Sequence, residues 1–323
     1  MTFASNMVRW SSSRWAPLRF DFLRSEIDII IAEDDPYYFL QAGEYVPKSK
    51  RKAAAADDDD VAGFVQSLVP TFLRVDTQGR VIRMDTFSKV RRHLPTPCRS
   101  LSHFSLNLRS PSQTIAPGIR LGWFTCSPLF AERLERIGEV STHAPCGLGQ
   151  VLVATLLSQW TFDSHLRWLR GLREQYKLRR DFFVDCLAEE FDLIPTPPST
   201  ISGGWAAAVA GGDHMVLSAY RRGEKSRPLL SLVPPSAGMF VWVDMYFGDV
   251  PDKTDEEDGS VLTPERQFWI RLIKAGVLTA PGWVFSPTAY AALGGSVSPL
   301  GEESRQVGHL RFSYTPTNVS LFS

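Results

Sequence analysis

The sequence predicts an α/β fold, in which an α/β core is followed by a smaller α+β domain. Two observations indicate this class. In the first half of the chain, short β-branched runs at residues 27–32 and 81–85 alternate with helical patterns. From Asp163 onward, apolar residues recur at spacings of three, four or seven, which predicts a long amphipathic helix that can connect two domains.

The other elements follow from local patterns. Residues 192–235 are rich in proline and glycine, so we expect loops there. Apolar periodicity predicts the remaining elements at these positions: a strand at 121–125, helices at 129–140 and 141–160, a strand at 238–243, a helix at 264–275 and a strand at 309–314.

Composition restricts the kind of protein. The chain has 323 residues, of which 44% are hydrophobic and 22% charged, as expected for a globular protein. Its 35 basic and 35 acidic residues cancel, which gives no support to a nucleic-acid partner. The longest apolar runs are far shorter than the ~20 residues that span a membrane. Residues 47–60 are a basic block followed by four aspartates; we interpret them as a solvated loop, with metal binding as the alternative.

The cysteines and the first residues bear on the cellular compartment. The four cysteines show no CxxC pairing, which favours reduced thiols in an intracellular protein without a metal site. Residues 1–20 contain three arginines, several serines and no acid, a composition compatible with a transit peptide. We therefore expect a cytoplasmic protein, with the mitochondrion as the alternative.

Three short segments contain chemically reactive groups. They are 33–38 (EDDPYY), 86–89 (TFSK) and 116–123 (APGIRLGW). An enzyme that uses pyridoxal 5'-phosphate needs a lysine for the aldehyde and a carboxylate beside the pyridine nitrogen. It also needs a donor near the ring oxygen, and hydroxyls with an arginine for the phosphate. The segments supply each of these groups through Asp34, Tyr37, Thr86, Ser88, Lys89 and Arg120.

Together these segments resemble the class I/II aminotransferases of pyridoxal-phosphate fold type I. They are most similar to the fungal aromatic amino acid aminotransferases and the kynurenine/2-aminoadipate aminotransferases. The resemblance covers roughly residues 28 to 316. It implies that Asp34 contacts the pyridine nitrogen, that Tyr37 contacts the ring oxygen, and that Lys89 holds the aldehyde and moves protons. Thr86, Ser88 and Arg120 would bind the phosphate, and Arg311, in HLRFSYT, would bind the substrate α-carboxylate.

The resemblance also implies a reaction and an organisation. The amino group of an L-amino acid, with an aromatic one favoured, would pass to a 2-oxo acid such as 2-oxoglutarate in a homodimer, with no nucleic acid or membrane involved. Residues 27–165 would be a partial cofactor-binding large domain. Residues 166–323 would be the linking helix and the small domain, and residues 1–26 an unrelated or disordered segment.

Two departures from the family are visible. The family has further large-domain segments before its DDPYY strand, so we expect a truncated sheet with an uncovered edge and faces. Residues 90–113 separate Lys89 from Arg120, and without these 24 residues the family spacing of seven is restored. The insert contains arginines but no acid. Every codon for its first residue, valine, begins with GT, and one codon for its last residue, glutamine, ends with AG. These are the terminal nucleotides of an intron, so we interpret the insert as translated intron.

Other functions remain open at this stage. An aminotransferase-like domain of a transcription regulator would bind the same cofactor as a sensor. A truncated chain could be inactive, and fold type I lyases use the same lysine.

Overall fold

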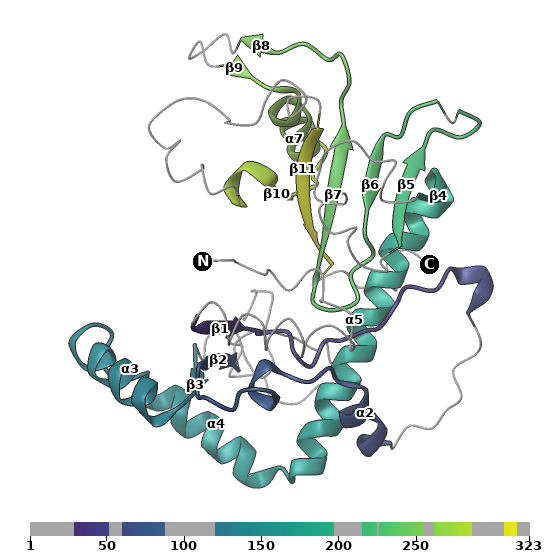
Figure 1. Cartoon of the computed structure of the whole chain (residues 1–323). Coiled ribbons are helices and arrows are strands. Elements are labelled where there is room, and N and C mark those ends of the chain that lie inside the picture. Colours follow the sequence, from purple (N-terminus) through teal and green to yellow (C-terminus); the bar gives the residue numbers. More distant parts are fainter. Residues whose placement is uncertain are drawn as a thin grey trace, which may run out of the picture.

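The computed structural model describes residues 29–51, 60–87, 120–196, 215–224, 226–254, 261–285 and 307–314. Two sheets lie beside one long helix, α5 (Phe162–Glu190), as Figure 1 shows. The predicted long helix is thus confirmed, and it has 29 residues. The N-terminal segment 1–26 and the insert 90–113 lie outside the described residues, so both interpretations stay predictions.

A three-stranded sheet occupies one end of the molecule. It consists of β1 (Ile31–Asp34), β2 (Val81–Thr86) and β3 (Gly122–Thr125) in that order. β1 runs parallel to β2, and β3 runs antiparallel to β2. The first strand lies later than the predicted 27–32, because it includes the acids that follow the apolar run.

The same half of the chain also contains helices and short turns. They are α2 (Val61–Ser67), α3 (Pro128–Val140) and α4 (Gly147–Gln159), with short 3-10 turns η1 (Lys48–Lys50) and η2 (Phe72–Arg74). The Asp60 side chain caps α2 by accepting a hydrogen bond from the amide of Gly63 at 2.6 Å. α4 begins six residues later than predicted. Pro145 explains the delay, because a proline disfavours helical backbone at the residue before it.

A six-stranded sheet occupies the other end, in the order β10-β11-β7-β6-β5-β4, with every neighbouring pair antiparallel. The segment 192–235, which we expected to be rich in loops, also contains three of these strands, which the sequence did not predict. Pro195 is tolerated because β4 is an edge strand. The strands are β4 (Asp192–Thr196), β5 (Val216–Tyr220), β6 (Leu230–Leu232), β7 (Phe240–Tyr246), β10 (Ala280–Pro281) and β11 (Val307–Ser313).

Smaller elements complete this end. The helix α7 (Pro264–Lys274) begins where Thr263 accepts a hydrogen bond from the amide of Arg266. A two-stranded ribbon, β8 (Lys253–Thr254) with β9 (Val261–Leu262), and the turn η5 (Gly282–Phe285) lie beside it. Among the described residues, no helix has both the length and the apolar character that a membrane crossing requires.

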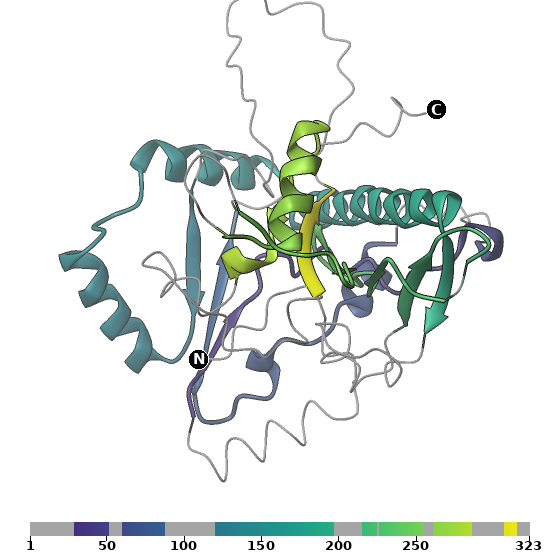
Figure 2. The same ribbon diagram turned by 90° about the horizontal axis from the view of Figure 1, so that it is seen from above.

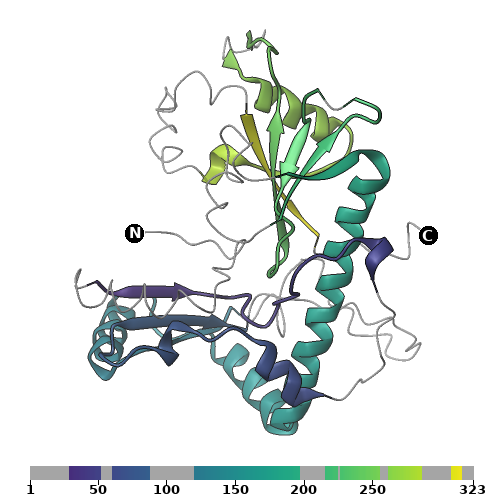
Figure 3. The same cartoon turned by 45° about the vertical axis from the view of Figure 1, so that its right-hand side comes forward.

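The main core lies between α5 and the six-stranded sheet. Leu172 and Val184 of α5 are fully buried against Val241 of β7, and Leu40 and Tyr45 from the N-terminal part join the same cluster. The first turns of α5 pack instead with α2, and Figure 3 shows the helix reaching from α2 and α4 to the six-stranded sheet. The predicted domain boundary at residues 165 and 166 falls within these first turns and stays a prediction.

Candidate active site

Three predicted site residues gather at one end of the three-stranded sheet. Because β1 and β2 are parallel, their carboxyl ends share an edge, where Asp34 ends β1 and Thr86 ends β2. β3 begins at this same end with Gly122 opposite Thr86, and Arg120 lies two residues earlier. Ser88 and Lys89 lie outside the described residues, so their predicted roles stay predictions.

The acid and the hydroxyl also share a face of the sheet. Asp34 pairs with Met84, two residues before Thr86, so strand alternation places Asp34 and Thr86 on one side. Asp34 is exposed. The Thr86 hydroxyl donates a hydrogen bond to the Leu121 carbonyl at 2.9 Å. A Cβ at Gly122 would lie 2.8 Å from the Asp85 carbonyl oxygen, so only glycine allows β3 this close to β2.

Arg120 has an unusual backbone. Its φ is 50°, in the left-handed region that residues other than glycine seldom adopt. Strained backbone of this kind persists where surrounding structure holds it in place, and it clusters at ligand sites. This backbone conformation distinguishes Arg120 from an ordinary exposed arginine in a loop.

The opposite face of this sheet carries a buried charge cluster. Arg83 is 4% exposed and donates to Asp85 at 2.9 Å, with Glu33 at 3.1 Å. Its guanidinium also lies 4.5 Å from the ring centre of Tyr38. Burial raises the pKa of Asp35 to about 6, although the charge of Arg83 opposes this rise. The cluster ties the end of β1 to β2 and so fixes the position of Asp34 on the other face.

The remaining two predicted residues, Tyr37 and Arg311, lie near each other where the two sheets approach. The Tyr37 ring meets Phe240 edge-on, with ring centres 6.1 Å apart, and Phe240 lies beneath the guanidinium of Arg311 at 4.2 Å. Burial raises the pKa of Tyr37 to about 12, and the charge of nearby Arg311 opposes the rise. The phenol therefore stays protonated at neutral pH and can donate a hydrogen bond.

Arg311 lies between two aromatic rings. Arg311 lies on β11, opposite Trp242 of β7. Its guanidinium carbon is 4.0 Å from the centre of the Phe285 ring. Burial lowers the pKa of Arg311, and nearby Tyr37 opposes this. Within the described ranges, Arg311 has no hydrogen bond or ion pair, and its Nε is buried without an acceptor. A half-buried guanidinium in this state requires an anionic partner, and a carboxylate matches its fork geometry.

Sequence reasoning did not assign roles to the aromatic residues of this site. Phe240 and Trp242 alternate along β7 and therefore share the face that carries Arg311, while Phe285 comes from η5. The indole nitrogen of Trp242 is also buried without a partner in the described structure. Strand alternation in GMFVWV gave a signal for the shared face, but the approach of Phe285 depends on tertiary structure.

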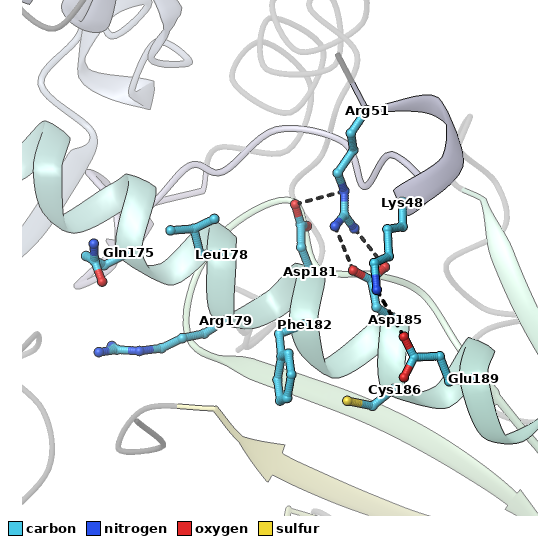
Figure 4. Close-up of a pocket in the computed structure, with 10 residues that line it drawn as sticks. All are labelled: Lys48, Arg51, Gln175, Leu178, Arg179, Asp181, Phe182, Asp185, Cys186 and Glu189. Carbon is cyan, nitrogen blue, oxygen red and sulfur yellow. Dashed lines mark hydrogen bonds and ion pairs between the residues drawn. The ribbon is translucent and has the colours of Figure 1, made fainter. Parts of the chain in front are cut away.

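A groove on α5, about 350 Å³ in volume, is a second candidate site (Figure 4). Four of its charged residues form pairs: Arg51 donates to Asp185 at 2.6 and 2.8 Å, and Lys48 lies 3.2 Å from Glu189. These pairs dock the segment after Tyr45 onto the helix. None of the sequence-predicted site residues is in the groove, so it explains attachment rather than chemistry. The lining residues are Lys48, Arg51, Gln175, Leu178, Arg179, Asp181, Phe182, Asp185, Cys186 and Glu189.

Comparisons with known proteins bear on the relationships of the whole chain. No family model matches the chain. An aromatic amino acid aminotransferase of Schizosaccharomyces pombe is 29% identical over 309 residues, 94% of this chain and 48% of the relative. An L-tyrosine:2-oxoglutarate aminotransferase of Tapinella panuoides is 28% identical, with 91% and 50% covered. The crystal structure of the aminotransferase Aro8 from Candida albicans superposes with a TM-score of 0.58 at 26% identity, covering 94% of this chain and 50% of that one.

These relationships and the fold identify the chain as a homologue of the aminotransferases, with part of the fold type I architecture. Its named relatives are aromatic amino acid and L-tyrosine:2-oxoglutarate aminotransferases, the branch that the sequence predicts. The transcription-regulator alternative gains no support from them. The chain spans about half the length of the curated relatives it matches.

Proposed function

We propose that this chain contains cofactor-binding residues and the carboxylate-binding arginine of a pyridoxal-phosphate aminotransferase. The reaction would move the amino group of an aromatic L-amino acid to a 2-oxo acid such as 2-oxoglutarate. The observation that carries the proposal is Arg311, which lies between two rings, has no anionic partner in the described structure and is adjacent to Tyr37.

The described residues fit pyridoxal 5'-phosphate. Asp34 offers an exposed carboxylate for the pyridine nitrogen, and Tyr37 offers a protonated phenol for the ring oxygen. Thr86 and Arg120 offer a hydroxyl and a guanidinium at the same sheet edge for the phosphate. When bound, the cofactor supplies an electron sink for the carbon that loses its proton. Ser88 would add a further phosphate hydroxyl, and Lys89 the amine that holds the aldehyde.

Each protein group has a defined task. The Lys89 amine would take a proton from the substrate α-carbon and return it at the neighbouring position, because a free amine is the base of suitable strength. Arg311 would hold the α-carboxylate and so orient the α-carbon. The Phe240 and Phe285 rings would exclude water from this contact, which strengthens it, and would pack against an aromatic side chain.

The acceptor follows from the same geometry. A 2-oxo acid has the same carboxylate beside the reacting carbon, so Arg311 can hold the donor and the acceptor in turn. The name of the Tapinella panuoides relative includes 2-oxoglutarate, which supports this acceptor class. We further propose a homodimer located in the cytoplasm or mitochondrion. The free thiols of Cys126, Cys146 and Cys186 agree with an intracellular location.

Two measurements on the purified full chain test the proposal. After incubation with the cofactor and borohydride reduction, mass spectrometry should locate the added mass on Lys89, and Lys89→Ala should lose it. Transfer from L-tyrosine to 2-oxoglutarate, followed by chromatography of glutamate, should require both components. Arg311→Lys should raise the KM for tyrosine about tenfold, equivalent to about 1.4 kcal/mol. The exposed Arg271→Lys is the matched control. Cofactor on another lysine, or an Arg311 variant indistinguishable from the control, contradicts the proposal.

A further inference from the structure

The tryptophan beside Arg311 has a hydrogen-bond donor that no described residue accepts. In the register of the six-stranded sheet, Trp242 of β7 is the direct partner of Arg311 on β11, so the two side chains lie on the same face. The Cβ atoms of such cross-strand partners are about 5 Å apart. The indole nitrogen of Trp242 and the Nε of Arg311 are both buried, and neither has an acceptor in the described structure.

Another tryptophan of this region shows the ordinary arrangement. Trp269 of α7 donates its indole N–H to the Thr279 carbonyl at 3.0 Å. A buried donor that has lost its water without gaining an acceptor destabilises the folded state, and such donors are rare in native structures. Two of them in adjacent side chains, Trp242 and Arg311, therefore indicate a shared acceptor that comes from outside the described residues.

Two aromatic rings restrict the orientation of the Trp242 indole. The His309 ring stacks against it, with ring centres 5.8 Å apart and an angle of 26° between the planes. The Phe285 ring meets it edge-on, at 5.7 Å between centres. His309 is in turn held by the Asp244 carboxylate at 2.8 Å. The elements η5 and α7 both contact β11, as Figure 2 shows from above. The indole N–H is therefore preorganised, which lowers the entropy cost of binding an acceptor.

Phe285 gives access to both donors. Its ring contacts the Trp242 ring and also lies 4.0 Å from the guanidinium carbon of Arg311. Phe285 is 41% exposed, whereas the two donor nitrogens are buried, so its ring is the outermost of the three groups. Exposed side chains change rotamer within nanoseconds. A ligand can therefore displace this ring and reach both nitrogens.

We propose that Trp242 is a specificity-determining residue that donates its indole N–H to the carboxylate that Arg311 holds. A carboxylate has two oxygens with about four lone-pair sites, so it can accept from the guanidinium and the indole together. A primary amide has one oxygen and one NH₂ group, and this NH₂ group would face a donor. The two residues thus select carboxylates over their neutral amides. The inference rests on the proposed function, because it adds a second donor for the carboxylate of both substrates.

The test measures the binding of two matched probes to the full chain, without added pyridoxal 5'-phosphate. One probe is para-hydroxyphenylpropanoate, which has the ring and carboxylate of tyrosine but no amino group, and the other is its primary amide. By calorimetric titration, the wild type should bind the propanoate about a hundredfold more tightly than the amide. Trp242→Phe should weaken propanoate binding about tenfold and change amide binding by less than about twofold.

Two further proteins separate the donor from ring packing. Trp269→Phe is the matched control, because it removes an indole N–H that already has an acceptor, and it should bind both probes as the wild type does. Benzothienylalanine incorporated in place of Trp242 retains both fused rings and exchanges only the N–H for sulfur. It should reproduce the loss in Trp242→Phe, and it decides the question if Trp242→Phe does not fold. In nitrogen-15 spectra of the wild type, the indole resonance that this protein lacks should shift when the propanoate is added.

Several outcomes would overturn the proposal. They are wild-type affinity for the propanoate in the benzothienylalanine protein, an equal loss in Trp269→Phe, an indole resonance of Trp242 that does not shift, and a wild type without preference for the propanoate. The proposed function fails separately. If the carboxylate binds through Trp242 as expected but no amino group is transferred from L-tyrosine to 2-oxoglutarate, the proposed function alone is contradicted.

Discussion

The two sheets lie along one helix but differ in how completely they are covered. In the six-stranded sheet, Val241 and Leu310 are fully buried. In the three-stranded sheet, every residue of β3 is exposed, and the helices that follow it cover little. Both sheets are rich in apolar residues, so composition does not explain the contrast. The difference shows that, among the described residues, the six-stranded region has a buried core, whereas β3 and the helices after it leave apolar side chains exposed.

Buried charge gives the largest expected contrast between the regions. Arg180 is fully buried, donates to Asp181 at 2.7 Å and to the Pro235 carbonyl at 3.0 Å. We expect Arg180→Met to lower the free energy of unfolding by about 3–5 kcal/mol, because buried acceptors lose their donor. The exposed pair of Arg136 with Glu132 in α3 should contribute less than about 1 kcal/mol, as Arg136→Ala will show.

Urea denaturation measures both changes. Arg180→Lys serves as the control because it retains the charge but loses the fork, and it should fall between the wild type and Arg180→Met. If Arg180→Met and Arg136→Ala lowered the free energy of unfolding equally, the buried charge network of Arg180 would contribute no more to stability than the exposed pair in α3.

Leucine truncation sharpens the same comparison. Leu172 is completely buried, so Leu172→Ala should cost about 2–5 kcal/mol of unfolding free energy. Leu152 in α4 is 56% exposed, and Leu152→Ala should change stability by less than about 0.5 kcal/mol in the isolated chain. If Leu152→Ala destabilised the isolated chain as much as Leu172→Ala, α4 would already have a packing partner.

The connection between β2 and β3 can be tested by deletion. Removing residues 90–113 joins TFSK directly to TIAPG and restores the spacing of the resemblance. We expect the deletion to tighten pyridoxal-phosphate binding by at least tenfold, about 1.4 kcal/mol, measured by fluorescence titration. Deleting the aspartates 57–59, which leaves the α2 cap Asp60 in place, is a control that should have little effect on this affinity. Weaker binding after removal of 90–113 would show that the insert belongs to the site.

The smallest expected effect is a pH dependence from the three-stranded region. Burial raises the pKa of Asp35 to about 6 from 3.8, so the folded state holds a proton that the unfolded state has lost. The contribution to stability is present below pH 3.8 and is lost as the pH rises through about 6. Asp35→Asn should therefore gain on the order of 1 kcal/mol over wild type at pH 7.5 but not at pH 3.5.

His309 gives an internal comparison in the other region. Burial acts to lower its pKa, but the Asp244 carboxylate at 2.8 Å raises the pKa overall. Its contribution is present below pH 6.5 and is lost only as the pH rises above that value. Denaturation measured across pH 3–9 separates the two windows. If the free energies of unfolding of wild type and Asp35→Asn changed equally between pH 3.8 and pH 6, the assignment to Asp35 would be contradicted.

The sequence allowed the elements with clear periodicity to be predicted. The long helix, α3, α7 and strand β2 appear close to their expected ranges, because their apolar spacing was unambiguous. β4, β5 and β6 were missed because each has only three to five residues, among prolines and glycines that are typical of loops. Their stability comes from pairing with distant strands, which local composition does not reveal.

The site was predictable in its polar groups and less so in its surroundings. Asp34 and Thr86 lie at one edge because parallel strands end there, a rule that the sequence alone could invoke, whereas the position of Arg120 follows from the antiparallel pairing of β3. The contact of Tyr37 with Phe240 and the placement of Arg311 between two rings depend on how the two sheets approach each other. No spacing in the chain encodes that approach.

The position of Leu40 has a consequence during synthesis. It is buried by residues around Met239, and its carbonyl accepts from the Gly238 amide at 3.2 Å. These partners are made about 200 residues later, which at 5–20 residues per second is a delay of roughly 10–40 s. During that interval the segment around Leu40 has not yet been buried by its later partners, so chaperones have time to bind it.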